Sequence, residues 1–135
     1  EQSRRLYQFA NELGMAFQLQ DDLLDSYGGE ELGKTIGGDI LEGKKSYLMV
    51  TAMSRADEEQ REVLRHTYKD AALAPAEKIA RVRAVFDALD VPRLTEQQIS
   101  LRFDRALATL DGLNVPDARK EPLREYARSL MGRRK

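Results

Sequence analysis

Apolar residues recur every three or four positions along most of this chain, which is the spacing of one face of an α-helix. Near the start, the pattern predicts a helix over residues 3–26, followed by Gly28 and Gly29, which favour a helix end. The residues on its buried face are expected to be Leu6, Phe9, Ala10, Leu13, Phe17 and Gln20. No stretch shows the period-two alternation of a half-buried strand. The pattern therefore predicts an all-α fold.

Five more helices are expected after a glycine-rich segment. Residues 27–43 hold six of the nine glycines and are predicted to be irregular. The following helices are predicted to begin near Gly43, after Asp57, at Pro75, at Pro92 to Thr95 and after Pro116, and to cover roughly 44–56, 58–69, 76–89, 95–113 and 117–131. The expected core positions of the later helices are Ile79, Val82, Val85, Phe86, Leu89, Ile99, Phe103, Leu107 and Leu110.

Composition narrows the class of protein. The 135 residues carry 22 lysines and arginines against 23 acidic residues, so no bulk field draws the chain to nucleic acid or to a membrane. No apolar run reaches the roughly 18 residues of a membrane-spanning helix, and no targeting signal is present, so we expect a cytoplasmic protein. The chain opens already in helical register without a cap or a methionine, and we expect it to be part of a longer chain.

Two common kinds of site are excluded. The chain has no cysteine and a single histidine, His66, which lies among charged residues of a predicted helix. A zinc site or a nucleophilic triad needs more such side chains than the sequence supplies. We therefore expect His66 to be a solvated surface residue.

Three aspartates close the first predicted helix. Asp21 and Asp25 are four residues apart and share a helix face, and Asp22 lies about 100° around the axis from Asp21. Carboxylates in a last turn repel one another and meet the negative end of the helix dipole, an effect of about 0.3–1 kcal/mol each when exposed. The group could be a solvated helix end. It could also bind a hard cation such as Mg²⁺ or Ca²⁺, which prefers oxygen ligands.

Lysines downstream favour the cation site. The stretch "LGKTIGGDILEGKKSY" places Lys34, Lys44 and Lys45 among glycines that let backbone approach a ligand closely. Such a composition is expected where a metal-bridged polyphosphate docks. It is not a Walker loop, because the G-x-x-x-x-G-K-[ST] spacing and a preceding strand are both missing. Lys44 and Lys45 could instead be an ordinary charge pair at a helix entry.

The block "GMAFQLQDDLLD" followed by "LGKTIGGDILEGKKSYL" closely resembles the second aspartate-rich region of trans-isoprenyl diphosphate synthases, the polyprenyl synthetase family. The resemblance covers about residues 14–50. It implies the C-terminal part of an isoprenoid-synthase helical bundle, with residues 1–135 as one all-helical segment of a larger synthase domain. It also implies a homodimer at full length and a Mg²⁺-dependent condensation of isopentenyl diphosphate with an allylic prenyl diphosphate.

The resemblance assigns roles to single residues. Those implied to bind Mg²⁺ or to support its water shell are Asp21, Asp22, Asp25 and Asp39. Those implied to contact the substrates are Phe17, Gln18, Lys34 and Lys44. Catalysis would depend on Asp21, Lys34 and Lys44. The closing Arg133, Arg134 and Lys135 resemble a basic C-terminus that in some farnesyl diphosphate synthases folds over the active site, although a frayed tail is the alternative.

One part of the family pattern is missing from these residues. The chain has a single adjacent aspartate pair, Asp21 and Asp22, whereas the family needs a second motif of this type. We therefore expect the 135-residue chain to be catalytically inactive by itself. Two other functions stay open, a terpene cyclase that ionises a prenyl diphosphate and a non-catalytic helical partner subunit.

Overall fold

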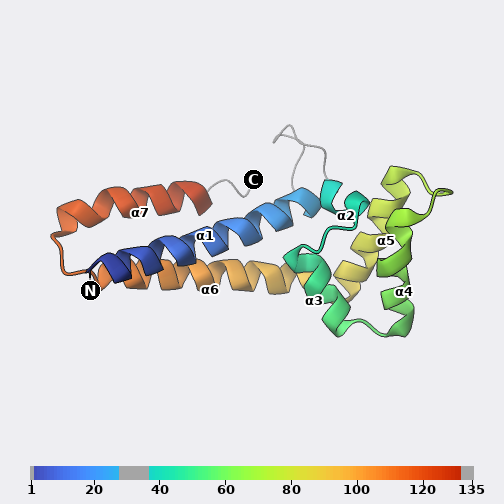
Figure 1. Cartoon of the computed structure of the whole chain (residues 1–135), viewed down its shortest axis with the longest axis horizontal. Helices are drawn as coiled ribbons and strands as arrows, with labels where there is room; N and C mark the ends of the chain where they lie inside the picture. The colour runs from blue at the N-terminus through green and yellow to red at the C-terminus, as the bar shows by residue number, and fades with distance from the viewer. Residues whose placement is uncertain (1, 28–36, 132–135) are drawn as a thin grey trace. The chain divides into compact units, whose positions relative to one another are not determined.

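The computed structural model describes residues 2–27 and 37–131. Within them the chain forms seven α-helices and one short 3₁₀-helix, and no strand (Figure 1). In chain order these are α1 (Gln2–Tyr27), α2 (Gly38–Glu42), α3 (Tyr47–Arg55), α4 (Glu58–His66), η2 (Thr67–Lys69), α5 (Pro75–Ala88), α6 (Val91–Asp111) and α7 (Asp117–Met131). The predicted all-α fold is confirmed.

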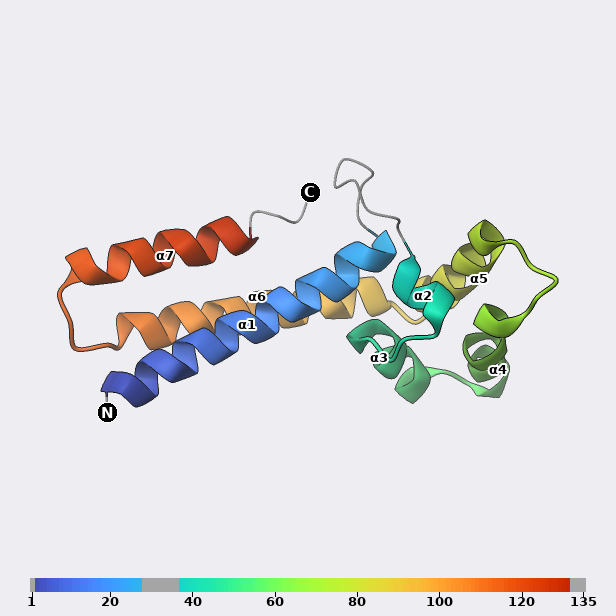
Figure 2. The ribbon, with the colours of Figure 1, turned by 45° about the horizontal axis from the view of Figure 1, so that its top comes forward.

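The described residues divide into two compact units. The first contains residues 2–20 of α1, α6 from Glu96 onward and α7. In both views this part of α1 lies beside α6 (Figures 1 and 2). The core side chains of this unit are Phe9, Leu13, Ala106, Leu110, Leu113 and Ala127. Arg5 closes one end by donating from Nη1 to the carbonyl oxygen of Gly112 at 2.8 Å.

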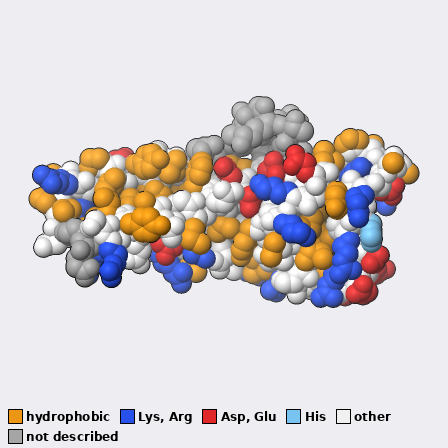
Figure 3. Space-filling model, in the orientation of Figure 1, with side chains coloured by type: hydrophobic (Ala, Val, Ile, Leu, Met, Phe, Trp, Pro, Cys, Tyr) orange, Lys and Arg blue, Asp and Glu red, His pale blue; other side chains and the backbone are white. Residues whose placement is uncertain are grey.

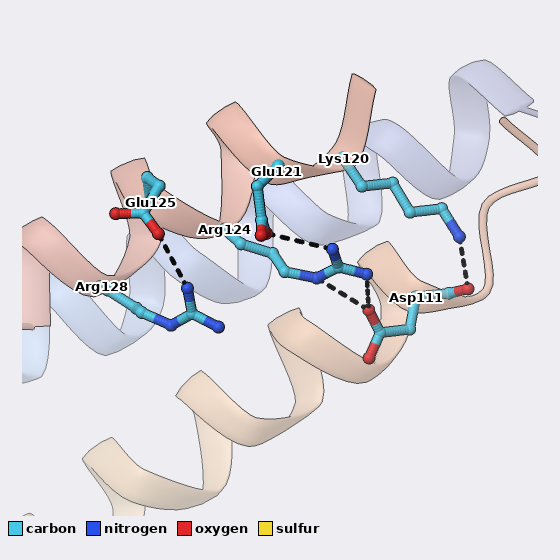
Figure 4. Close-up of polar contacts among 6 residues, drawn as sticks. All are labelled: Asp111, Lys120, Glu121, Arg124, Glu125 and Arg128. Carbon is cyan, nitrogen blue, oxygen red and sulfur yellow. Dashed lines mark hydrogen bonds and ion pairs between the residues drawn. The ribbon is translucent and has the colours of Figure 1, made fainter. Parts of the chain in front are cut away.

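Polar contacts attach α7 to the end of α6 within the first unit (Figure 4). Lys120 is buried and donates from Nζ to the carbonyl oxygen of Asp111 at 2.8 Å, satisfying a carbonyl at the end of the helix. Arg124 donates to Oδ1 of Asp111 from Nε at 3.2 Å and from Nη2 at 2.7 Å. The helix α7 is thus joined to the end of α6 by the buried Lys120 and by two hydrogen bonds from Arg124.

The second unit contains residues 21–27 and 37–95. It holds the last turns of α1, then α2, α3, α4, η2, α5 and the first turn of α6. Its buried side chains include Leu48, Leu64, Val82, Phe86 and Val91. The second unit contains Asp21, Asp22, Asp25, Asp39, Lys44 and Lys45, the described aspartates and lysines predicted to form the site.

Several helix boundaries follow from local chemistry. Asp57 accepts from the backbone N–H of Gln60 at 2.8 Å while the Gln60 side chain accepts from the Asp57 N–H at 2.9 Å, a complete capping box. The helix predicted from residue 58 is therefore confirmed, with a 3₁₀ turn as its last part. The last helix, predicted over 117–131, is confirmed at the same residues.

The prediction around Gly43 was wrong. Residues 38–42, expected to be irregular, form α2, and the next helix begins at Tyr47 rather than near Gly43. Gly43 has φ +69°, the left-handed conformation that ends a helix. The Ser46 side chain then accepts from the Met49 N–H at 3.3 Å and caps α3.

The predicted core was right for most deeply buried positions. Val82, Val85, Phe86, Ile99 and Leu110 are buried. Leu6 and Ala10, expected on the buried face of the first helix, are exposed, with Leu6 at 45%.

In the described part of the chain, none of the helices combines the length and apolar character that crossing a bilayer requires. The residues expected to end the first helix, Gly28 and Gly29, lie outside the described residues.

Candidate functional site

Three aspartates and one lysine come together in the second unit. Asp22 and Asp25 lie in the last two turns of α1, Asp39 lies in the first turn of α2, and Lys44 follows that short helix. Lys44 Nζ is 3.6 Å from Oδ2 of Asp39 and 3.9 Å from Oδ1 of Asp22. The structure thus brings together side chains that are up to 22 positions apart in the sequence.

Asp25 holds the start of α2. Its Oδ2 accepts from the backbone N–H of Asp39 at 2.7 Å, and its carbonyl oxygen accepts from the N–H of Gly37 at 2.5 Å. The first N–H groups of a helix have no intrahelical partner, so a carboxylate there satisfies a donor and complements the helix dipole. Gly37 has φ +92°, which a residue with a Cβ rarely adopts.

Asp22 has the same role at α3. It is 6% exposed, and its Oδ2 accepts from the backbone N–H of Tyr47 at 3.0 Å. Tyr47 is the first residue of α3, so this carboxylate satisfies one of the donors that the helix leaves open. Asp22 and Asp25 therefore fix the two segments that carry Asp39 and Lys44.

The charge of the cluster is only partly compensated. Burial raises the pKa of Asp39 above its ordinary value of 3.8, and the neighbouring Asp25 carboxylate is the second cause of the rise. The Lys44 ammonium lowers this pKa. The Lys44 side chain is 48% exposed, so water or an anion can reach it. The negative charge of the neighbouring Asp25, which favours the protonated form of Asp39, would also favour a bound cation.

Asp21 differs from its neighbours. It is half-buried, and its side chain makes no hydrogen bond or ion pair with another of the described residues. It lies four residues before Asp25, on the same face of α1. Its oxygens are therefore not committed to a helix cap, in contrast to those of Asp22 and Asp25.

The donor set fits Mg²⁺ in its chemistry. Among residues 2–27 and 37–131, no three acidic, histidine or cysteine side chains converge closely enough to hold a metal ion without other ligands. Mg²⁺ usually takes one or two carboxylates and completes its shell with water and substrate phosphate oxygens. Asp21 and Asp25 supply such a pair, and the cluster has neither nitrogen nor sulfur ligands that would favour zinc.

The remaining predicted site residues lie elsewhere. Phe17 and Gln18 are on α1 in the first unit, where Phe17 lines an apolar groove of about 440 Å³. The other walls of this groove include Leu6, Leu13, Leu123 and Tyr126. Lys34, Arg133, Arg134 and Lys135 lie outside the described residues. His66 is exposed, as expected, and its Nε2 lies 3.3 Å from a carboxylate oxygen of Glu62.

One contact near the cluster was not foreseen. Tyr27, the last described residue of α1, donates from its hydroxyl to Oδ1 of Asp87 on α5 at 2.8 Å. Arg83 lies over the Tyr27 ring at 4.9 Å from its centroid. These residues anchor the end of α1 within the second unit. No local sequence signal could have paired them, because the partners are 60 positions apart.

These observations define an all-helical protein in which aspartates at the end of α1 cap two downstream helices and lie beside a lysine. A family model for the polyprenyl synthetases matches residues 1–88. The chain belongs to this family, the trans-isoprenyl diphosphate synthases, as its aspartate-rich block predicted.

Named relatives agree with the family model. The chain is 35% identical to the farnesyl pyrophosphate synthase of Homo sapiens over 105 residues, which is 78% of this chain and 24% of that protein. It is 37% identical to heptaprenyl diphosphate synthase component 2 of Geobacillus stearothermophilus over 120 residues, 86% of this chain and 35% of that protein.

One solved structure has a similar helical fold. It is a geranylgeranyl pyrophosphate synthase from Corynebacterium glutamicum complexed with isoprenyl diphosphate and magnesium, with a TM-score of 0.84 and 32% identity. The similarity covers 98% of this chain and 37% of that one. The chain thus spans between about a quarter and two fifths of the length of these relatives.

Proposed function

We propose that this chain is part of a prenyltransferase that joins isopentenyl diphosphate to an allylic diphosphate in a Mg²⁺-dependent reaction. The observation that carries the proposal is the cluster in which Asp22 and Asp25 fix the segments bearing Asp39 and Lys44. The family membership supports the same reaction class. A homodimer and a cytoplasmic location belong to the proposal because the resemblance and the composition imply them.

The chain's own residues would position the leaving group. Asp21 and Asp25 would hold Mg²⁺, which when bound neutralises the diphosphate as its C–O bond ionises. Lys44 would donate to the departing oxygens from a side chain already oriented by Asp39 and Asp22. The electron pair of the isopentenyl double bond would then attack the allylic cation, and a proton would be lost. Gln18 and Lys34 would contact the diphosphate, and Phe17 would line the isopentenyl pocket.

The 135 residues alone are expected to give no turnover. They contain one adjacent aspartate pair, and the reaction class needs a second carboxylate cluster on another helix. An assay of the chain with allylic diphosphate, isopentenyl diphosphate and Mg²⁺ checks this expectation. Product above a protein-free blank would contradict it.

A chimera tests the proposed activity itself. The matching segment of the Corynebacterium glutamicum geranylgeranyl pyrophosphate synthase would be replaced by this chain, and product formation measured. We expect Mg²⁺-dependent turnover. In the chimera, Asp21→Ala and Lys44→Ala should lower turnover by about two orders of magnitude or more, because they remove transition-state charge stabilisation.

Asp104→Ala provides the matched control, since Asp104 is an exposed carboxylate on α6. Its turnover should equal that of the unmodified chimera. A chimera that is helical by circular dichroism yet inactive would contradict the proposal and favour the non-catalytic partner subunit. Full activity of Asp21→Ala would contradict the metal assignment alone.

A further inference from the structure

The adjacent lysines Lys44 and Lys45 face different surfaces of the second unit. Lys44 lies against Asp39 and Asp22. Lys45 instead lines an open pocket of about 320 Å³ bordered by residues of α3, α4 and η2. This pocket contains none of the aspartates of the candidate active site. Lys45 is therefore available for a role that the proposed reaction does not use.

The pocket has an apolar floor and a basic rim. The apolar side chains that line it are Met49, Met53, Leu64 and the ring of Tyr68. The basic side chains that line it are Lys45, Arg65, His66 and Lys69. Figure 3 shows Lys, Arg and His side chains beside hydrophobic ones on the face over α3 and α4. A surface of this kind is suited to a ligand with an apolar body and an anionic head.

Two of the four basic groups have no counter-charge within residues 2–27 and 37–131. Arg65 lies 3.5 Å from Glu62 and 3.7 Å from Glu58, and His66 also contacts Glu62. Within the described part of the chain, neither Lys45 nor Lys69 forms an ion pair. Lys69 Nζ lies 5.8 Å from the centroid of the Tyr68 ring. Lys45 and Lys69 are therefore the basic groups that would stabilise a bound anion most.

The wall formed by Tyr68 is held in place without a ligand. A Cβ at Gly43 would lie 2.4 Å from Cε2 of Tyr68, so the ring packs directly on the Gly43 backbone. Lys78 donates from Nζ to the Tyr68 carbonyl oxygen at 2.9 Å. A preformed wall lowers the ordering that binding would otherwise require.

We propose that this pocket is a second ligand site, which binds a small organic phosphate with an aliphatic body. Methionine side chains adapt to flexible chains, and lysine ammonium groups are effective point charges for phosphate. The volume is near the lower end of the roughly 300–1,000 Å³ typical of ligand pockets, so the ligand is small. Lys44 and Lys45 are adjacent in the loop of residues 43–46. A ligand at Lys45 would therefore contact the same loop that carries Lys44.

The test uses the full 135-residue chain with n-hexyl phosphate as the probe. Binding is measured by calorimetry, and contacts by the ¹³C-methyl shifts of Met49 and Met53. We expect saturable binding that shifts both methyl signals. The double variant Lys45→Gln/Lys69→Gln should weaken binding at least tenfold and remain folded, because both side chains are exposed. The double variant Arg4→Gln/Arg105→Gln is the matched control, because it removes two positive charges from exposed residues outside the pocket, and it should bind the probe as the unmodified chain does.

Inorganic phosphate and n-hexanol separate the two parts of the ligand. Each should bind at least tenfold more weakly than n-hexyl phosphate if the floor and the rim act together. Equal binding of n-hexanol would overturn the anionic part of the proposal, and equal binding of inorganic phosphate would overturn the apolar part. Unchanged affinity in the Lys45→Gln/Lys69→Gln variant, an equal loss in the Arg4→Gln/Arg105→Gln control, or unshifted methionine signals would overturn the site itself.

Discussion

The three motif aspartates have different tasks at the residue scale. Asp22 and Asp25 each accept a hydrogen bond from a backbone N–H in the first turn of a downstream helix. Asp21 has no such partner among the described residues. From the sequence alone the three aspartates cannot be told apart. Their spacing shows that they share a helix end, but it does not show which backbone N–H groups lie near each carboxylate. The structure separates a residue suited to ligand chemistry from two that also hold the fold.

Substitution of each aspartate should expose this difference. Asp22→Ala leaves the Tyr47 N–H without its acceptor in a part-buried position, and we expect a loss of about 1–3 kcal/mol in the free energy of unfolding. Asp21→Ala removes no contact of this kind and relieves repulsion, so its effect should lie within about 0.5 kcal/mol. Urea unfolding at pH 7 without Mg²⁺ measures both.

Asp22→Asn serves as a control because it keeps one acceptor oxygen and a similar volume. Its loss should be smaller than that of Asp22→Ala. Equal stability of the Asp21 and Asp22 alanine variants would contradict the capping role of Asp22.

At the scale of elements, sequence patterns found the helices that local chemistry defines. α4 was predictable because Asp57 and Gln60 form its capping box within four residues. α2 was not, because it has only five residues, begins at Gly38 directly after Gly37, and has its Asp39 N–H satisfied by Asp25 from another helix. The aspartates and the lysine that the structure brings together could be selected from sequence as candidates, whereas the Tyr27 to Asp87 contact depends on tertiary packing.

Gly43 is an element boundary that is sensitive to substitution. Gly43→Ala places a side chain at φ +69° and against the Tyr68 ring, so we expect a loss of at least about 1–2 kcal/mol in stability. Gly14→Ala is the control, because a Cβ there meets nothing within 4 Å in the middle of α1. It should stabilise the chain by about 0.5–1 kcal/mol. Thermal unfolding of the two variants measures the difference, and a neutral Gly43→Ala would show that the boundary is not constrained.

At the scale of the whole molecule, the two units each have a core of their own. The first is built from α1, α6 and α7, and the second from the short helices that surround the aspartate cluster. The all-α class followed from periodicity alone. The division into units did not, because it depends on which apolar faces pack together over long separations.

The incomplete carboxylate set predicts how this chain responds to ligands. Mg²⁺ alone should leave the melting temperature unchanged, since no three ligands converge among the described residues. Mg²⁺ with inorganic pyrophosphate should raise it, because the phosphate oxygens complete the coordination shell and meet Lys44. At a ligand concentration one hundred times Kd the stabilisation would be about 2.7 kcal/mol. Ca²⁺ without pyrophosphate is a suitable control, and a saturable rise with Mg²⁺ alone would contradict the prediction.

The helix caps formed by Asp22 and Asp25 also constrain how this protein can change over evolutionary time. A descendant released from selection for catalysis could lose Asp21 with its fold intact. Loss of Asp22 would instead leave the first N–H of α3 without its acceptor and destabilise the segment that carries Lys44 and Lys45. Part of the aspartate motif should therefore outlast the proposed activity, so that a descendant without it would still carry the second and third aspartates for their role in the fold.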